Sequence, residues 1–257
     1  MPPAESSPIP RRVLVTGSAG VVGRAVCQEL LARGHFVRGF DLSPSPHASE
    51  SVTGSITEPA ELDAAMASID TLVHLAAEPN ECDFLTRLLP SNIIGVYHVM
   101  DAARRHGLRR VVLTSSVMVN GRFVGLPEVI RLERPTSPTT HYAVTKLFAE
   151  SIGRMYATVH KLSVLVVRLA WVVRTPEEVD RMVRMGAQPM YTSRGDAGRF
   201  FAAGVEAEAI DYKIVYASSK PTADAVGVDL EPARKLLGYE PRDTFPEGLP
   251  FAWPARS

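Results

Sequence analysis

Tyr142 and Lys146 are the two side chains whose types and spacing best suit acid–base chemistry. They are four residues apart in Tyr142-Ala-Val-Thr-Lys146, so a helix places them on one face, one turn apart. A phenol with a pKa near ~10 is a poor base at neutral pH, but a nearby ammonium group stabilises the phenolate and lowers that pKa. The pattern predicts Tyr142 as a base activated by Lys146, although a solvated surface pair has the same spacing.

Ser116 is the third candidate catalytic residue. It ends Leu113-Thr-Ser-Ser116 at the carboxyl end of an expected strand, which is the edge where ligands bind in open α/β sheets. Its hydroxyl can hydrogen-bond the reacting oxygen of a substrate. Asn92 begins an expected helix and has two interpretations: it orients a backbone group or a water near Lys146, or it caps the helix.

A glycine-rich loop, Gly17-Ser-Ala-Gly20-Val-Val-Gly23, connects the first expected strand to a helix. In this setting Gly17 permits a tight turn, Gly20 lets the backbone approach a pyrophosphate, and Gly23 lets the helix pack closely on the sheet. Free N–H groups and the helix dipole then hold the anion. The motif predicts a dinucleotide site that also includes Ala19, Val21 and Val22; a glycine-rich turn without a ligand is the alternative.

Asp41 ends the second expected strand, 18 positions after Gly23. An acid at this place binds the ribose hydroxyls of adenosine. Residues 42–46 contain no Arg or Lys that would neutralise a 2′-phosphate, so the pattern predicts NAD rather than NADP as the cofactor. The other interpretation of Asp41 is a turn former ahead of Pro44.

The order of the elements predicts how these residues are positioned. Short β-branched runs alternate with helical patterns, which is typical of βαβ units and of an α/β fold with a doubly wound parallel sheet, the Rossmann architecture. We expect a flexible tail over 1–10 and a single NAD-binding domain over 11–257, with a small C-terminal substrate lobe built mainly from 175–257. The expected strands are 12–16, 36–41, 71–75, 110–114, 163–167 and 213–215, and the expected helices are 22–33, 59–66, 92–106, 142–160 and 230–237.

The composition disfavours several classes of protein. Lys plus Arg (28) equal Asp plus Glu (28) among the 257 residues, which leaves no surplus positive charge for nucleic acid. Two cysteines and seven histidines without ligand spacing predict no disulfide framework and no metal site. The N-terminus lacks the pattern of an export signal, and no apolar run reaches the roughly 20 residues that cross a bilayer. We therefore expect a cytoplasmic protein that binds a small molecule and no membrane.

The motifs, in this order, resemble the extended short-chain dehydrogenase/reductase family, also described as NAD-dependent epimerases and dehydratases. The resemblance covers nearly the whole chain. The segments Asn92-Ile-Ile-Gly-Val-Tyr97 and Lys213-Ile-Val-Tyr216 look most like uronate dehydrogenases, which oxidise free hexuronic acids to lactones with NAD. The family's order is matched by the glycine motif, Asp41, His74-Leu-Ala-Ala77, Asn92, Ser115-Ser116, Tyr142 to Lys146 and Lys235-Leu-Leu-Gly-Tyr-Glu-Pro241.

The resemblance implies roles for these residues. Tyr142 is the catalytic base, Lys146 binds the nicotinamide ribose, and Ser116 holds the substrate hydroxyl. The helices 92–106 and 142–160 resemble the family's dimer-forming pair, which implies a homodimer. The further positions that it places against NAD are Ser55, Ile56, Leu75, Ala76, Ala77 and Asn92.

Several positions depart from the family pattern. Val117 and Met118 stand where uronate dehydrogenases carry Asn-His and sugar-nucleotide dehydratases carry an acid pair, which disfavours dehydration because neither side chain transfers protons. Ser55 replaces an Asp that many relatives direct toward the adenine. Roughly 80 residues follow Thr175, which favours a substrate smaller than a nucleotide sugar. Arg181 and Arg184 could bind a substrate carboxylate through their planar donors, or form a solvated helix face.

The leading hypothesis is an NAD-dependent dehydrogenase that acts on a small sugar-like hydroxyl, with uronates among the candidates. One alternative is a sugar epimerase that uses NAD transiently, and another is a dinucleotide-sensing regulator without catalysis. His74 is interpreted as a packed core residue. Trp171 either lines the substrate mouth or packs in the core.

Overall fold

In the computed structural model, which describes residues 9–221 and 226–251, a seven-stranded sheet forms the centre of the protein. All of its strands pair in parallel, in the order β3-β2-β1-β4-β5-β6-β7. This confirms the doubly wound α/β architecture. The strands are β1 (Arg12–Thr16), β2 (Phe36–Asp41), β3 (Glu50–Thr53), β4 (Thr71–His74), β5 (Arg110–Ser116), β6 (Ser163–Leu169) and β7 (Tyr212–Ala217).

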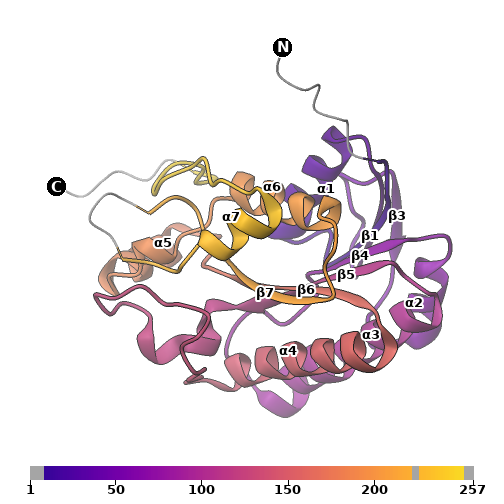
Figure 1. The fold of residues 1–257 in the computed structure, drawn as a ribbon, viewed down its shortest axis with the longest axis horizontal. Helices are drawn as coiled ribbons and strands as arrows, with labels where there is room; N and C mark the ends of the chain where they lie inside the picture. Colours follow the sequence, from indigo (N-terminus) through magenta and orange to yellow (C-terminus); the bar gives the residue numbers. More distant parts are fainter. Residues whose placement is uncertain (1–8, 222–225, 252–257) are drawn as a thin grey trace.

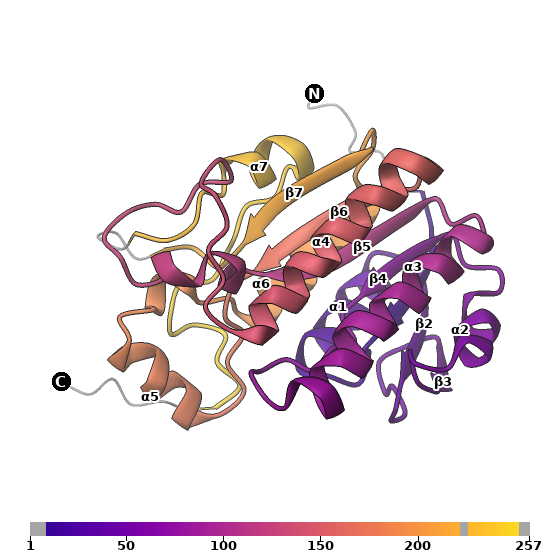
Figure 2. The ribbon, with the colours of Figure 1, turned by 90° about the horizontal axis from the view of Figure 1, so that it is seen from below.

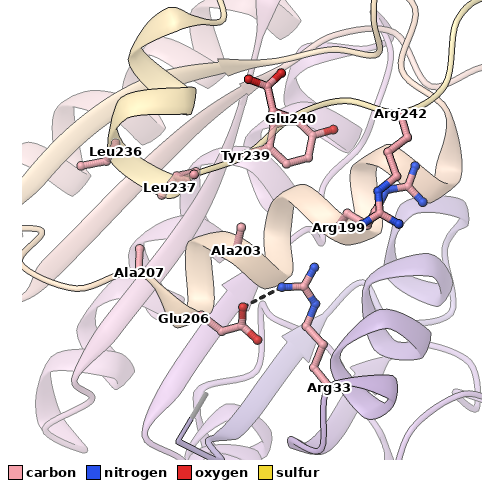
Figure 3. Close-up of a pocket in the computed structure, with 11 residues that line it drawn as sticks. Arg33, Arg199, Ala203, Glu206, Ala207, Leu236, Leu237, Tyr239, Glu240 and Arg242 are labelled. Carbon is pink, nitrogen blue, oxygen red and sulfur yellow. Dashed lines mark hydrogen bonds and ion pairs between the residues drawn. The ribbon is translucent and has the colours of Figure 1, made fainter. Parts of the chain in front are cut away.

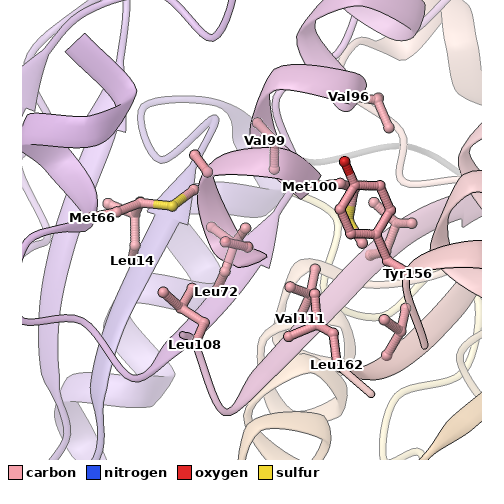
Figure 4. Close-up of a cluster of buried hydrophobic side chains, with 14 of the residues drawn as sticks. Leu14, Met66, Leu72, Val96, Val99, Met100, Leu108, Val111, Tyr156 and Leu162 are labelled. Atoms are coloured by element: carbon pink, nitrogen blue, oxygen red, sulfur yellow. The ribbon is translucent and has the colours of Figure 1, made fainter. Parts of the chain in front are cut away.

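Each face of the sheet is covered by helices, as Figures 1 and 2 show. Successive strand residues point to opposite faces, so Leu14 belongs to one apolar cluster while Val13 and Val15 belong to the other. The Leu14 cluster, drawn in Figure 4, packs under α2 (Pro59–Met66), α3 (Val96–Arg105) and α4 (His141–His160). The opposite cluster packs under α1 (Val21–Ala32), α6 (Arg194–Glu206) and α7 (Glu231–Leu237).

The long helix α4 is defined at both ends by local chemistry. Thr140 is its N-cap, and the Thr140 hydroxyl accepts a hydrogen bond from the backbone N–H of Ala143 at 3.1 Å. The helix ends at Lys161, whose φ of 57° is left-handed. The predicted helix 142–160 is therefore confirmed to within one residue, with Tyr142 in its first turn.

The helix that leads into α3 and the strand β3 differ from the sequence-based prediction. The predicted helix 92–106 begins earlier, as a π-helix (Phe84–Gly95) with Pro90 inside it that runs directly into α3. Pro90 supplies no backbone N–H and its ring crowds the preceding turn, which fits a wider helix. The strand β3 was not predicted, because its four residues are mostly exposed and show no run of buried side chains.

The segment after Thr175 contributes to the core as well as to the carboxyl edge of the sheet. The helix α6 packs closely on α1, since a Cβ on Gly198 would lie 2.7 Å from the carbonyl oxygen of Ala25. The strand β7 completes the sheet beside β6. The helix α5 (Pro176–Arg184) and a 3-10 turn (Gln188–Met190) extend beyond the sheet, where Val173, Met182 and Tyr191 belong to a separate small cluster.

The expected tail 1–10 falls almost entirely outside the described residues, as do 222–225 and 252–257. Over the ranges 9–221 and 226–251, no helix is both long enough and apolar enough to span a membrane.

Candidate active site

The candidate site lies where the carboxyl ends of β1, β2, β4, β5 and β6 meet the first turns of α1 and α4. Parallel strands all end at the same edge of the sheet, and chain connections reverse between β1 and β4. The glycine loop follows β1, Asp41 ends β2, and Ser116 ends β5. The fold therefore collects at one edge residues that are far apart in the sequence.

Ser116 and Tyr142 are brought together by this arrangement, because the Ser116 side chain lies close enough to the phenol to lower its pKa. Ser116 is buried and also accepts a hydrogen bond from the backbone N–H of Met118 at 3.2 Å. Burial raises the pKa of Tyr142, while Ser116 and the positive charge of Arg174 oppose that rise. The pKa lowering expected from Lys146 is not seen: Lys146 is not among the groups that act on the phenol, and loss of water around the phenol outweighs the effects of Ser116 and Arg174.

Lys146 lies beneath the phenol ring. Its Nζ is 5.7 Å from the Tyr142 ring centroid and donates a hydrogen bond to the Thr114 carbonyl oxygen at 3.2 Å. The side chain is buried, and burial lowers the pKa of Lys146 to about 8. Tyr142 and Lys146 thus share one helix face as predicted, and the ammonium is held by the end of β5.

His74 is a structural residue of the core. Its Nδ1 hydrogen-bonds the Thr16 hydroxyl at 2.8 Å. Burial, followed by the charge of Lys146, lowers the pKa of His74 to about 3. The imidazole is therefore neutral at physiological pH, in keeping with its interpretation as a packed core histidine.

Asn92 lies inside the π-helix, whose N-cap is Asp83, so the capping interpretation is wrong. The Asn92 amide accepts from the backbone N–H of Glu78 at 2.8 Å and donates to the Glu78 carbonyl at 3.0 Å. It also donates to the Thr145 hydroxyl at 3.1 Å. Asn92 therefore fixes the loop after β4 against α4 at Thr145, the residue before Lys146.

The glycine loop has the shape of a phosphate-binding turn. Gly17 has a φ of +74°, and a Cβ there would lie 2.6 Å from the backbone N of Ala76. A Cβ on Gly23 would lie 2.1 Å from the Gly17 carbonyl oxygen, so the helix meets the loop without room for a side chain. The first turn of α1 has no side-chain cap and Gly20 is exposed, which leaves the backbone N–H groups of Val21 and Val22 without side-chain acceptors.

Asp41 lies against this loop. One carboxylate oxygen accepts from the backbone N–H of Ala19 at 3.0 Å, and the other accepts from Ser43 at 3.2 Å. Ser55 follows β3, and its hydroxyl hydrogen-bonds Thr57 at 2.8 Å. Ile56 is buried against the apolar cluster under α3. Leu75, Ala76 and Ala77, directly after β4, are partly buried, and Gly17 packs on the first two.

The substrate side contains one arginine that the sequence did not single out. Arg174 lies between β6 and α5, and its charge acts on Tyr142. Arg181 is exposed, and its Cζ lies over the Trp171 ring, 5.8 Å from the ring centroid. Arg184 is exposed in the last turn of α5. The charge of Arg174 thus opposes the rise in the pKa of Tyr142, whereas Arg181 and Arg184 are exposed residues of α5.

A buried ion pair joins β6 to α4, the helix that carries Tyr142 and Lys146. The Arg168 guanidinium donates to both carboxylate oxygens of Glu150, at 2.9 Å each. Glu150 also accepts from the Ser115 hydroxyl at 2.7 Å, and Arg168 donates to Asn120 and Tyr216. The sequence signals this ion pair only weakly. Arg168 stands among apolar residues in its strand, and Glu150 follows Lys146 by one helical turn.

The described part of the chain also has a surface groove of about 400 Å³ between α1, α6 and α7, drawn in Figure 3. The positive charges of its arginines are balanced by carboxylates: Arg33 forms an ion pair with Glu206, and Arg199 forms one with Asp196. None of the candidate site residues lines it. Across 9–221 and 226–251, no three His, Cys, Asp or Glu side chains are grouped so that they could hold a metal ion.

This fold and this cluster of hydroxyl, phenol and ammonium groups beside a glycine loop define a dinucleotide-dependent enzyme of the short-chain type. Residues 13–191 match the NAD dependent epimerase/dehydratase family, and the chain belongs to that family. NAD is the cofactor of the family, and the uncapped start of α1 with Asp41 beside it fits that cofactor.

Among curated proteins, the chain is 30% identical to an L-arabinose 1-dehydrogenase (NAD(P)(+)) of Haloferax volcanii, over 90% of this chain and 96% of that protein. It is 26% identical to a uronate dehydrogenase of Pseudomonas putida, over 91% of this chain and 84% of that protein. The solved uronate dehydrogenase of Agrobacterium tumefaciens superposes with a TM-score of 0.77 at 29% identity, covering 91% of this chain and 85% of that one. The expected resemblance is thereby confirmed.

Proposed function

We propose that this protein is an NAD-dependent dehydrogenase that transfers a hydride between nicotinamide and a hydroxyl of a small sugar-like molecule. The observation that carries the proposal is the cluster of Ser116, Tyr142 and Lys146 at the sheet edge that also holds the glycine loop, with the Lys146 Nζ 5.7 Å from the Tyr142 ring centroid. Two neighbouring hydroxyls can bind one substrate oxygen between them, with Lys146 one helical turn away.

In the proposed mechanism, Tyr142 accepts the proton of the substrate hydroxyl and Ser116 donates a hydrogen bond to the same oxygen, stabilising its developing negative charge. Lys146 is held by the Thr114 carbonyl and keeps a positive charge near the phenol below pH of about 8. The chemistry supplied by bound NAD is acceptance of the hydride at the nicotinamide ring. In the reverse reaction Tyr142 donates the proton that it accepts in the forward direction, and a carbonyl is reduced to a hydroxyl.

We assign NAD binding to the loops at the carboxyl edge. The first turn of α1 would hold the pyrophosphate, and Asp41 would exchange its contact with Ala19 for the adenosine ribose hydroxyls. Lys146 would bind the nicotinamide ribose. The residues proposed for the cofactor are Gly17, Ala19, Gly20, Val21, Val22, Gly23, Asp41, Ser55, Ile56, Leu75, Ala76, Ala77, Asn92, Tyr142 and Lys146.

The proposed substrate is a free sugar or sugar acid. The relatives named as arabinose and uronate dehydrogenases support this class. The proposed substrate-side elements come mainly from residues 175–257, chiefly α5. The proposed substrate contacts are Ser116 at the end of β5 and Arg181 and Arg184 on α5. Val117 is buried and apolar, so it adds no polar contact to the sugar, and further polar recognition beyond Ser116 and Tyr142 is assigned to the arginines of α5.

The test is to mix the protein with NAD and a panel of aldoses, hexuronic acids and nucleotide sugars, and to follow NADH by absorbance. Tyr142→Phe is expected to keep NAD affinity and lose turnover by roughly 10²-fold or more. Tyr97→Phe, the same change at an exposed tyrosine, is the control. Full turnover by Tyr142→Phe would refute the assignment, and sugar conversion without net NADH would favour an epimerase. Binding of NAD with no conversion of any sugar would favour a sensor.

We also propose that the protein forms a homodimer through α4 and the π-helix with α3, which run side by side in Figure 2. Ile94, Val144, Met155 and Val159 are exposed apolar residues on these helices. Met155→Glu is expected to produce monomers in light scattering. We further propose a cytoplasmic location, which the unpaired Cys27 and Cys82 support.

A further inference from the structure

The loop that joins β2 to β3, residues 42–49, is fastened to the glycine loop by a serine. Within this loop only Ser45 is buried, and its hydroxyl forms a hydrogen bond with the hydroxyl of Ser18, which is also buried. Ser45 donates its backbone N–H to the Ser51 hydroxyl at 2.9 Å. One residue of the loop is thereby bound both to the glycine loop and to β3.

Gly39 on β2 makes room for this contact. A Cβ at Gly39 would lie 2.6 Å from both the Cβ and the Oγ of Ser45, and 2.9 Å from the Ser18 Oγ. The two hydroxyls therefore occupy the space that a side chain at this position of β2 would need. Since Ser18 is only 1% exposed and its hydroxyl lies beside Gly39, that hydroxyl faces β2 rather than the surface of the glycine loop.

The chain on either side of Ser45 is stiff. Pro44 and Pro46 flank it, and the ring of each proline fixes its own φ at about −65°. Each proline also restricts the residue before it to extended conformations, and those residues are Ser43 and Ser45. A fixed Ser45 therefore limits where the backbone of Ser43 can lie.

Ser43 holds the carboxylate that is assigned to the adenosine ribose. The backbone N–H of Ser43 donates to one oxygen of Asp41 at 3.2 Å, and the backbone N–H of Ala19 donates to the other at 3.0 Å. When ribose hydroxyls replace the Ala19 contact, the Ser43 contact is the one that still orients the carboxylate. The orientation of Asp41 therefore depends on a loop whose position is fixed by Ser45.

We propose that Ser45 is a positioning residue for the adenosine half of NAD: its hydrogen bond to Ser18 holds the 42–49 loop against the glycine loop and so orients Asp41 for the ribose hydroxyls. The inference rests on the NAD contact assigned to Asp41 under the proposed function, and it does not depend on which sugar is oxidised. Neither Ser18 nor Ser45 is among the residues assigned to touch the cofactor.

The test measures the dissociation constants of NAD and of ADP-ribose by titration calorimetry, for the full-length protein and for Ser45→Ala, Ser18→Ala and the double variant. Each substitution removes the same hydrogen bond. We expect each single variant to bind NAD about 3- to 10-fold more weakly, and the double variant to bind no more weakly than the weaker single variant. ADP-ribose lacks the nicotinamide, so we expect the same fold-change for it as for NAD.

Ser163→Ala is the control for the loss of a serine hydrogen bond elsewhere in the sheet. The Ser163 hydroxyl accepts from Arg110 Nε at 3.0 Å at the start of β6, which is the opposite edge of the sheet from the site. This variant is expected to bind both ligands as tightly as the parent protein. A loss equal to that of Ser45→Ala would overturn the inference, because general destabilisation would then explain both.

Asp41→Ala separates the inference from the assignment on which it rests. Weaker NAD binding by Asp41→Ala, together with unchanged binding by Ser45→Ala, would overturn the inference alone. Unchanged binding by Asp41→Ala would overturn the assignment of Asp41 and the inference with it. Additive losses for Ser18→Ala and Ser45→Ala would show that the two hydroxyls act separately, and a loss for NAD without one for ADP-ribose would place the effect in the nicotinamide half; either result contradicts the proposal.

Discussion

Removal of the Arg168 guanidinium is expected to lower the free energy of unfolding by more than the loss of a surface ion pair does. The side chains of Arg168 and Glu150 are only 5% and 8% exposed, and the pair is bidentate. Arg168→Met leaves the Glu150 carboxylate buried with the Ser115 hydroxyl as its remaining side-chain donor. Breaking a buried pair in this way costs about 3–5 kcal/mol of unfolding free energy. For a chain of this size, that corresponds to a fall in Tm of roughly 6–20 °C.

The assay is urea unfolding followed by circular dichroism, at two pH values. In Arg168→Met the unpaired Glu150 carboxylate destabilises the folded state while it is charged, and protonation in acid removes that penalty. The stability deficit should therefore be smaller at pH 5 than at pH 8. Arg104→Met, which breaks an exposed pair with Asp101, is the control and should cost less than about 1 kcal/mol.

The double variant Arg168→Met, Glu150→Leu separates the charge from the packing. Replacing both partners removes the uncompensated carboxylate, so part of the stability should return. A double variant whose loss equals the sum of the single losses would contradict the reasoning, as would Arg168→Met within 1 kcal/mol of the parent protein.

Three further outcomes are expected. Gly23→Ala should weaken NAD binding and lower stability by about 1–3 kcal/mol, because its Cβ would lie 2.1 Å from the Gly17 carbonyl; calorimetry and thermal melts check this. Asp41→Ser should raise the affinity for NADP relative to NAD in a fluorescence titration, because a carboxylate that repels a 2′-phosphate is gone. Lys146→Met should raise Tm at pH 7, because the folded state lowers the pKa of Lys146 to about 8 and charging it below that value costs stability. That gain should shrink between pH 8 and 10, while turnover is lost throughout.

The parts of the site that the sequence predicts are those determined by short-range patterns. The glycine loop and the Tyr142 to Lys146 pair depend on neighbours within one or two turns, so their geometry could be inferred directly. Asp41 and Ser116 could be placed because parallel strands end at a common edge. Only their mutual distances required the structure.

The parts that the sequence does not predict depend on contacts between distant segments. Arg174 gains its position from Asn80, 94 residues away, and no local pattern signals that contact. The pKa of Tyr142 depends on how deeply the phenol is buried, which spacing alone does not reveal. The π-helix begins at Phe84 and contains Pro90, and the sequence does not signal it because proline is normally absent from helix interiors.

The edge strand β3 has a consequence for how copies of the protein meet. It is four residues long, its exposed residues include Glu50, and that carboxylate pairs with Arg38 on the neighbouring strand. An edge that is short and charged is a poor template for the addition of a foreign strand. Growth of the sheet from one molecule into the next, the usual start of fibrous aggregation, is thereby discouraged at this margin.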